Sequence, residues 1–199
     1  MAIRVMILNG PNLNLLGVRE PHIYGTTTLS AIEASCREFA AAIGASLAFH
    51  QSNHEGVLVD WVQAARNEAD AVIINPAGFS FTSIALLDAL KAFDGPIVEL
   101  HISNIHARDP LHRDSVISSV AKAVICGLGP YGYIVALLAA ARMLEALPQS
   151  LPQPLRRYGL GRPETGPNWP RLTPGRRRRR WPRRSARPTP AGCACHPSG

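Results

Sequence analysis

Residues 7–25, ILNGPNLNLLGVREPHIYG, decide how the rest of this chain is interpreted. The stretch begins inside an apolar run, Ile3–Leu8, and leaves regular structure at the breaker cluster Asn9-Gly10-Pro11. A long segment follows that holds Arg19 and Tyr24. A buried strand that opens directly into a polar loop is typical of open α/β sheets, whose ligands bind beyond the carboxyl ends of the strands. The stretch therefore predicts one strand of such a sheet and a loop of its binding site.

The first 147 residues alternate apolar runs with segments of helical periodicity. Apolar strands that lack a period of two and are separated by helices indicate a parallel sheet covered by helices on both faces. The expected fold class is therefore α/β, a flavodoxin-like three-layer fold with a five-stranded parallel sheet. Strands are predicted at 3–9, 46–51, 71–75, 97–102 and 121–126, helices at 28–43, 57–67, 83–93 (starting at Thr82 or Ser83) and 131–147, and a loop at 103–119.

Charge divides the chain into two parts. Residues 1–147 carry nine Lys or Arg and thirteen Asp or Glu, a net charge of −4, whereas residues 148–199 carry twelve Arg and one Glu, a net of +11. The two together give the net charge of +7. We expect residues 1–147 to form one catalytic domain. The Pro- and Arg-rich tail, 148–199, is predicted to be disordered, because it has too few aliphatic side chains to offset chain ordering. A basic arm that binds nucleic acid is the alternative for the run Arg176–Arg180.

The cysteines show no disulfide framework and no zinc-ligand spacing. Cys36 and Cys126 lie in apolar surroundings, and Cys193 and Cys195 form a lone CxC in the tail. We expect free thiols in a reducing compartment. The N-terminus lacks the features of a signal peptide, and no run reaches the ~18 apolar residues of a membrane span. The expected location is the cytoplasm.

Polar side chains gather where the predicted strands end. Because the carboxyl ends of parallel strands share one edge of a sheet, these side chains predict a polar rim around a pocket. Taken singly, each has a structural explanation, such as an asparagine in a turn. They are Asn9 and Asn12 after the first strand, Ser52, Asn53 and His54 after the second, Asn75 after the third, and Glu99, His101, Ser103 and Asn104 at the fourth.

Two pairs of residues favour acid–base chemistry. An isolated tyrosine has a pKa of about 10 and is a poor base, but a nearby guanidinium favours the phenolate. Arg19 is close enough in sequence to act on Tyr24 in this way. The alternative, without a catalytic role, is a surface ion pair between Arg19 and Glu20 that contributes little to stability. His101 can act as an acid near neutral pH, with Glu99 on the same face of its strand.

Positive charge follows the fourth predicted strand. Arg108 and Arg113 stand in the expected loop 103–119 and offer charge to an anionic substrate. Nucleotide binding is weakly supported, because the chain has no GxxxxGK[ST] or GxGxxG loop and GLGPYG at 127–132 has different spacing.

Several collinear motifs resemble type II 3-dehydroquinate dehydratase. They are LNGPNLNLLGVREPHIYG, QSNHEG, INPAGFSFTS, ELHISNIHARDP and AVICGLGPYGY, and the resemblance runs from about Ile3 to Leu144 without covering the tail. It implies a flavodoxin-like enzyme of the shikimate pathway that removes water from 3-dehydroquinate to give 3-dehydroshikimate through an enolate. It also implies a homododecamer, no metal, no cofactor and no Schiff-base lysine.

The resemblance assigns roles to individual residues. Tyr24 would be the base, tuned by Arg19, and Asn12 would hold the enolate through a water. His101 would be the acid, supported by Glu99. The expected substrate-binding residues are Asn75, Asp88 (acting in a neighbouring subunit), Ile102, Ser103, Arg108 and Arg113.

The chain departs from the family pattern at two positions. Phe81 stands where the family commonly has a histidine, so no polar role is carried to it. His112 stands where the family tends to have an arginine, with Arg113 next to it, and charge favours Arg113 as the substrate contact. The rival interpretation of the whole chain is a non-catalytic, flavodoxin-like ligand-binding protein whose basic tail binds nucleic acid.

Overall fold

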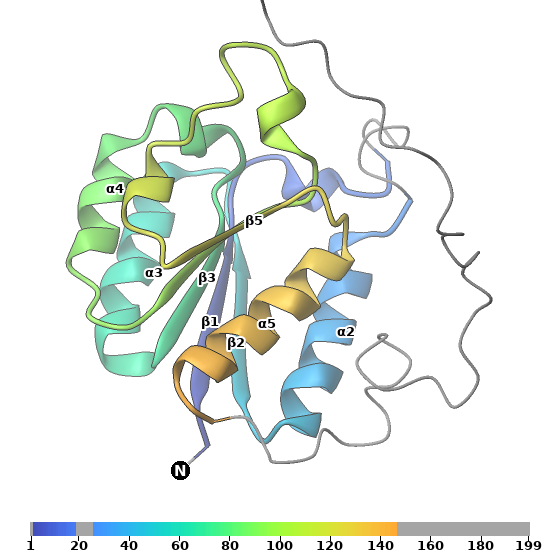
Figure 1. Ribbon diagram of the computed structural model, residues 1–199, viewed down its shortest axis with the longest axis vertical. Helices are drawn as coiled ribbons and strands as arrows, with labels where there is room; N and C mark the ends of the chain where they lie inside the picture. Colours follow the sequence, from blue (N-terminus) through green and yellow to red (C-terminus); the bar gives the residue numbers. More distant parts are fainter. Residues whose placement is uncertain (1, 19–25, 147–199) are drawn as a thin grey trace, which may run out of the picture. The chain divides into compact units, whose positions relative to one another are not determined.

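The chain folds into one parallel β-sheet with helices on both of its faces (Figure 1). The computed structural model describes residues 2–18 and 26–146, which belong to one unit, Met1–Glu164. The sheet order is β2-β1-β3-β4-β5, which is that of flavodoxin-like folds and confirms the expected fold class. The strands are β1 (Arg4–Asn9), β2 (Ser46–Gln51), β3 (Ala71–Asn75), β4 (Ile97–His101) and β5 (Ala123–Cys126).

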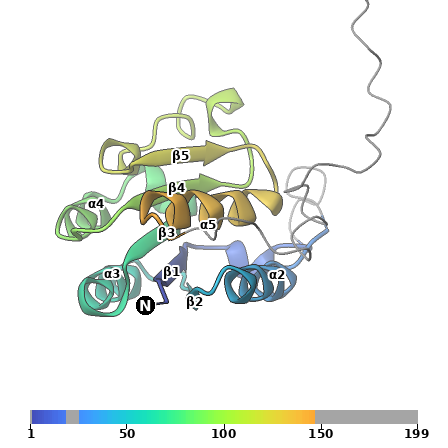
Figure 2. The same ribbon diagram turned by 60° about the horizontal axis from the view of Figure 1, so that its bottom comes forward.

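Four α-helices cover the sheet in two pairs, α2 with α5 and α3 with α4 (Figure 2). Alternate side chains of β1 and β3 divide between the two cores: Ile7 and Ile73 pack with α2 and α5, whereas Leu8 and Ile74 pack with α3 and α4. Both faces of the central strands are therefore apolar, which explains their unbroken hydrophobic runs. The helices are α2 (Leu29–Ala42), α3 (Glu55–Glu68), α4 (Ile84–Lys91) and α5 (Tyr131–Met143).

Hydroxyl caps set the start of two helices. The Thr28 hydroxyl accepts a hydrogen bond from Ala31 N at 3.2 Å, which confirms the predicted start of α2. Ser83, one of the two expected starts of the third helix, accepts one from Leu86 N at 2.9 Å and caps α4. The sequence placed the end of the last helix at Leu147, but α5 ends at Met143, two residues before the left-handed turn at Glu145.

Short 3-10 helices occupy segments that were expected to be irregular. The predicted loop 103–119 contains η3 (Ile105–Ala107) and η4 (Ile117–Ser119), while η1 (Leu13–Leu15) and η2 (Ala77–Phe81) follow β1 and β3. Such turns satisfy their backbone groups locally and leave no long apolar pattern in the sequence. The predicted tail, 148–199, lies outside the described residues.

The chain leaves β1 in close contact with the chain that leaves β3. Gly10 N donates a hydrogen bond to Asn75 O at 2.8 Å, and a Cβ on Gly10 would lie 2.2 Å from the carbonyl oxygen of Pro76. Only glycine fits there without a backbone shift. Gly10 therefore holds the β1 loop against η2.

We predict that Gly10→Ala lowers the free energy of unfolding by about 1–3 kcal/mol, because the methyl group collides with backbone. The measurement is urea unfolding followed by circular dichroism. Gly56→Ala is the control, since no heavy atom lies within 4 Å of its added Cβ in α3. This control should be neutral or stabilising by up to about 1 kcal/mol. Equal stability of the two variants would contradict the close approach.

Candidate functional site

A pocket of about 210 Å³ lies at the carboxyl edge of the sheet, beyond the ends of β1, β3 and β4. In-register pairing places Asn9 of β1 beside Asn75 of β3, so the segments that follow both strands reach the same wall. Apolar side chains of Leu13, Leu16 and Phe81 complete the lining. Six residues expected at the site line this pocket, namely Asn12, Asn75, His101, Ile102, Ser103 and Arg108.

The first turn after β1 is held by residues that follow β2. Asn12 adopts a left-handed conformation with φ 66°, and its backbone N–H donates to Asn53 Oδ1 at 2.9 Å. Gln51 Nε2 donates to the same Asn53 oxygen at 3.0 Å and to Gly10 O at 3.2 Å. Hydrogen bonds to Asn53 and Gln51 therefore fix the backbone of Asn12 at the pocket. The side-chain amide of Asn12 makes no capping hydrogen bond to η1.

A buried tyrosine joins the ends of β1 and β3. Tyr133 of α5 is fully buried, and its hydroxyl donates to Asn9 Oδ1 at 2.7 Å while accepting from Asn75 Nδ2 at 3.1 Å. Asn9 Nδ2 in turn donates to His50 O at 2.9 Å. Because Tyr133 takes one of the two N–H donors of the Asn75 amide, the other N–H and the side-chain oxygen Oδ1 are left for a ligand. Burial raises the pKa of Tyr133, so it acts as a neutral phenol.

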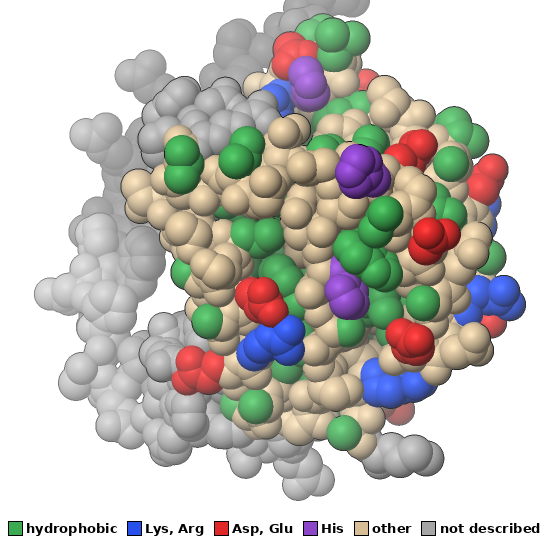
Figure 3. All heavy atoms as spheres, turned by 180° about the vertical axis from the view of Figure 1, so that it is seen from behind, with side chains coloured by type: hydrophobic (Ala, Val, Ile, Leu, Met, Phe, Trp, Pro, Cys, Tyr) green, Lys and Arg blue, Asp and Glu red, His purple; other side chains and the backbone are tan. Residues whose placement is uncertain are grey.

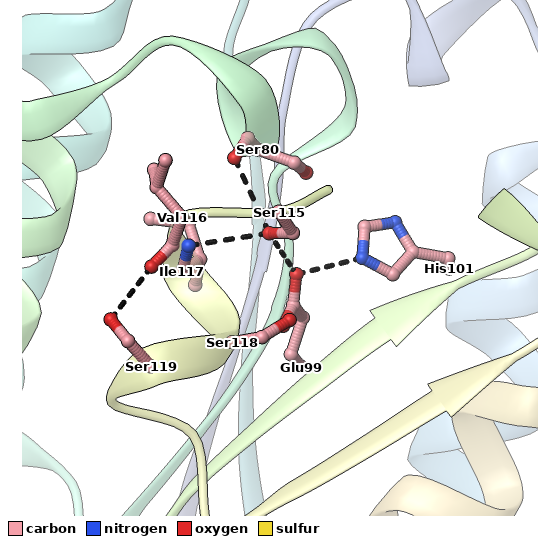
Figure 4. Close-up of polar contacts among 8 residues, drawn as sticks. All are labelled: Ser80, Glu99, His101, Ser115, Val116, Ile117, Ser118 and Ser119. Carbon is pink, nitrogen blue, oxygen red and sulfur yellow. Dashed lines mark hydrogen bonds and ion pairs between the residues drawn. The ribbon is translucent and has the colours of Figure 1, made fainter. Parts of the chain in front are cut away.

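Glu99 and His101, two residues apart on β4, meet at the pocket (Figure 4). His101 Nε2 lies 2.8 Å from Glu99 Oε1, as the predicted shared strand face requires. The same oxygen accepts a hydrogen bond of 2.5 Å from Ser115 Oγ, and Glu99 Oε2 accepts one from Ser118 Oγ. Nδ1 is therefore the ring nitrogen of His101 that remains for a ligand in the pocket.

Glu99 is buried and ionised. Its side chain has no exposure to water, and burial by itself raises the pKa of the carboxyl group. Hydrogen bonds from His101, Ser115 and Ser118, with the charge of His101, outweigh burial, and together they hold the pKa of Glu99 below its usual range. A fixed negative charge thus lies behind the imidazole that lines the pocket.

Two expected substrate contacts lie away from this pocket. Asp88 stands on α4 with a side chain that is 62% exposed and forms an ion pair of 2.9 Å with Lys91. Arg113 Nε lies 3.6 Å from Asp114, and its side chain is not in the pocket lining. His112 lines the pocket instead, 2.8 Å from Asp109 and edge-on to the Phe81 ring at 5.3 Å. The predicted base Tyr24 and its partner Arg19 lie outside the described residues.

The sequence profile of the family "Dehydroquinase class II" matches residues 3–141 of this chain. The chain belongs to the class II dehydroquinase family. The match covers every element of the sheet and leaves out the basic tail.

Named dehydroquinases are close relatives of the chain. It is 54% identical over 137 residues to "Catabolic 3-dehydroquinase 1" of Aspergillus fumigatus, covering 69% of this chain and 91% of that protein. It is 56% identical over 135 residues to "3-dehydroquinate dehydratase 1" of Agrobacterium fabrum, covering 68% of this chain and 93% of that protein. The crystal structure of type II dehydroquinase from Propionibacterium acnes superposes with a TM-score of 0.69 at 40% identity, covering 71% of this chain and 98% of that one.

Sequence reasoning missed three contributors to the dehydroquinase site. Ser115 and Ser118 stand in the predicted loop, and nothing in their spacing connects them to Glu99. Tyr133 was placed on an apolar helix. Its hydroxyl could have indicated a contact with a polar group of the site, because a buried tyrosine usually has a hydrogen-bond partner.

Within residues 2–18 and 26–146, no cluster of three or more His, Cys, Asp or Glu side chains is arranged to hold a metal ion. No helix of that same part has the length and hydropathy to cross a membrane.

We predict that Tyr133→Phe lowers the free energy of unfolding by about 1–3 kcal/mol, because it leaves Asn9 Oδ1 and Asn75 Nδ2 buried without their partner. Urea unfolding measures the change. If Tyr133→Phe is as stable as the wild type, the buried bridge does not contribute as argued.

Proposed function

We propose that this protein dehydrates 3-dehydroquinate to 3-dehydroshikimate through an enolate, as the names of its relatives imply. The observation that carries the proposal is the Glu99–His101 pair at the pocket of a class II dehydroquinase fold. An imidazole backed by a buried carboxylate is suited to deliver a proton to a leaving hydroxyl.

The reaction breaks a C–H bond beside the substrate ketone and a C–O bond one carbon further on. A carbon–carbon double bond forms, and the hydroxyl leaves as water after taking a proton. This sequence requires a base, a group that stabilises the enolate oxygen, and an acid. We assign these roles to Tyr24, to Asn12 through a water, and to His101. Arg19 is proposed to favour the phenolate of Tyr24.

The acid assignment follows from the hydrogen bonds of His101. Its Nε2 faces Glu99, so the proton for the leaving hydroxyl comes from Nδ1. His101 has 4% exposure, so little water competes for this proton.

The wall beside His101 is proposed to bind the substrate carboxylate and hydroxyls. Ile102 and Ser103 follow β4 directly and offer backbone and hydroxyl groups, and Arg108 adds a positive charge. Asn75, at the end of the neighbouring strand β3, has a side-chain oxygen that can accept from a substrate hydroxyl.

The non-catalytic alternative is not favoured. A protein that only binds ligands has no need of a buried carboxylate held behind a pocket histidine. Basic and acidic side chains are interspersed on the face shown in Figure 3. Several charged side chains of the described residues form ion pairs, including Arg4 with Asp70 and Arg37 with Glu33. The nucleic-acid role would thus depend on the tail, which lies outside the described residues.

Four finer expectations remain proposals. The homododecamer is supported by Asp88, which is exposed on α4 and is proposed to serve the pocket of a neighbouring subunit. A biosynthetic role stays a prediction, because the fungal relative named above is a catabolic enzyme. The cytoplasmic location and the division into a catalytic domain, 1–147, and a tail, 148–199, also stay predictions.

Tyr24→Phe tests the proposed reaction most simply. We expect kcat to fall by about 10²–10⁴-fold with substrate affinity largely kept, because a phenyl ring binds but accepts no proton. The measurement is ultraviolet absorbance of the conjugated enone product, without added metal or nucleotide. Absence of product from the wild-type protein would overturn the proposed function, and unchanged kcat in Tyr24→Phe would overturn the role of this base.

Phe81→His restores a polar group at the pocket rim. We expect the fold to persist and kcat or KM to change by less than about tenfold, the range of a single neutral hydrogen bond. Steady-state kinetics and size-exclusion chromatography measure both effects. Collapse of the folded assembly would contradict the position of Phe81 at the pocket.

A further inference from the structure

Two serines, one just before η4 and one within it, donate hydrogen bonds to the Glu99 carboxylate. Ser115 and Ser118 approach it from the side opposite His101, as Figure 4 shows. Resting on the proposed function, we propose that Ser115 and Ser118 are positioning residues for the dehydration step. Their hydroxyls fix the orientation and charge of Glu99 and thereby keep the proton shared by the Glu99–His101 pair on the imidazole.

The distances around Ser115 indicate which group accepts its hydroxyl proton. Its oxygen accepts from Ile117 N at 3.2 Å, and it lies 2.5 Å from Glu99 Oε1 but 3.3 Å from Ser80 O. A hydroxyl has a single proton, so Ser115 donates it to the carboxylate. Ser118 donates to the other oxygen, Oε2. Each oxygen of Glu99 therefore has its own hydroxyl donor.

The backbone that carries these serines is anchored independently of Glu99. Val116 N donates to Ser80 O at 2.9 Å, which ties the segment to η2. The Ile117 side chain is fully buried in the core beneath α3 and α4. Ser119, in the same turn, donates to Val116 O at 2.8 Å and points away from Glu99 (Figure 4). Removal of one hydroxyl should therefore leave the turn in place.

The chemical consequence concerns where the shared proton resides. When it lies on His101 Nε2, the ring is an imidazolium and Nδ1 is a good acid. When it moves to Glu99, the ring is neutral and Nδ1–H is a far weaker acid. Hydrogen-bond donors stabilise the charged form of a buried carboxylate. When the carboxylate loses a donor, the cost of burying its charge is less well compensated, and its affinity for a proton rises. The serines thus oppose transfer of this proton from His101 to Glu99.

Other groups around the carboxylate are neutral. Cys126 of β5 pairs in register with His101, and burial, followed by the charge of Glu99, raises the pKa of its thiol. From η2 and from residues 115–118 the facing groups are the Ser80 backbone and the two serine hydroxyls. Arg108 and His112 line the pocket on the other side of His101 from Glu99 and do not hydrogen-bond the carboxylate, so the titration at the carboxylate is that of the Glu99–His101 pair.

The test compares Ser118→Ala with Ser118→Thr, which keeps a hydroxyl, and with the control Ser119→Ala. We expect Ser118→Ala to lower kcat by about tenfold to a hundredfold, the range for a hydrogen bond to a charged group, with little change in KM. The alkaline limb of its kcat profile should move to higher pH, because the pair holds its shared proton more tightly. Ser118→Thr should recover most of the activity, and Ser119→Ala should match the wild type.

A double-mutant cycle with Glu99→Gln separates positioning from a structural role. In the Glu99→Gln background there is no carboxylate charge, so adding Ser118→Ala should change kcat by less than about twofold. Additive losses, or an alkaline limb that stays in place in Ser118→Ala, would overturn the inference. Wild-type turnover in the same assay distinguishes this outcome from failure of the proposed function.

Discussion

The site depends on a negative charge that has no contact with water. An ionised carboxylate is costly to bury unless hydrogen-bond donors replace its hydration. Glu99 has three such donors, one imidazole and two hydroxyls, and they come from two separate segments of the chain. The end of β4 and the turn before β5 must therefore be placed together for the charge to persist. The position of His101 at the pocket follows from this arrangement.

The parallel sheet brings the polar residues of the site together. Register pairs Asn9 with Asn75 and His101 with Cys126, so the polar ends of the strands meet at one edge. Tyr133 then couples β1 and β3 from beneath the pocket, and Gly10 allows their following loops to touch. The apolar cores on the two faces stabilise the sheet, and the polar network at its edge selects which groups face a ligand.

The sequence predicted the fold and much of this edge. Strands such as Ala71–Asn75 were recognisable because burial on both faces requires unbroken apolar runs. Asn12, Asn75, Glu99 and His101 were found because strand ends converge in any parallel sheet. Ser115 and Ser118 were not, because they reach Glu99 through tertiary packing of an irregular segment that has no periodic pattern. Arg113 was favoured over His112 for its charge, but His112 is the one of the two that lines the pocket.

The charge of Glu99 can be observed directly by infrared difference spectroscopy during a pH titration, comparing wild type with Glu99→Gln. The pKa of Glu99 is lowered in the folded state, so its ionised form contributes stability above the ordinary glutamate range and loses it only as pH falls through that lowered pKa. We expect no protonated-carboxyl band from Glu99 at neutral or mildly acidic pH. A protonated-carboxyl band at neutral pH that disappears in Glu99→Gln would contradict the account.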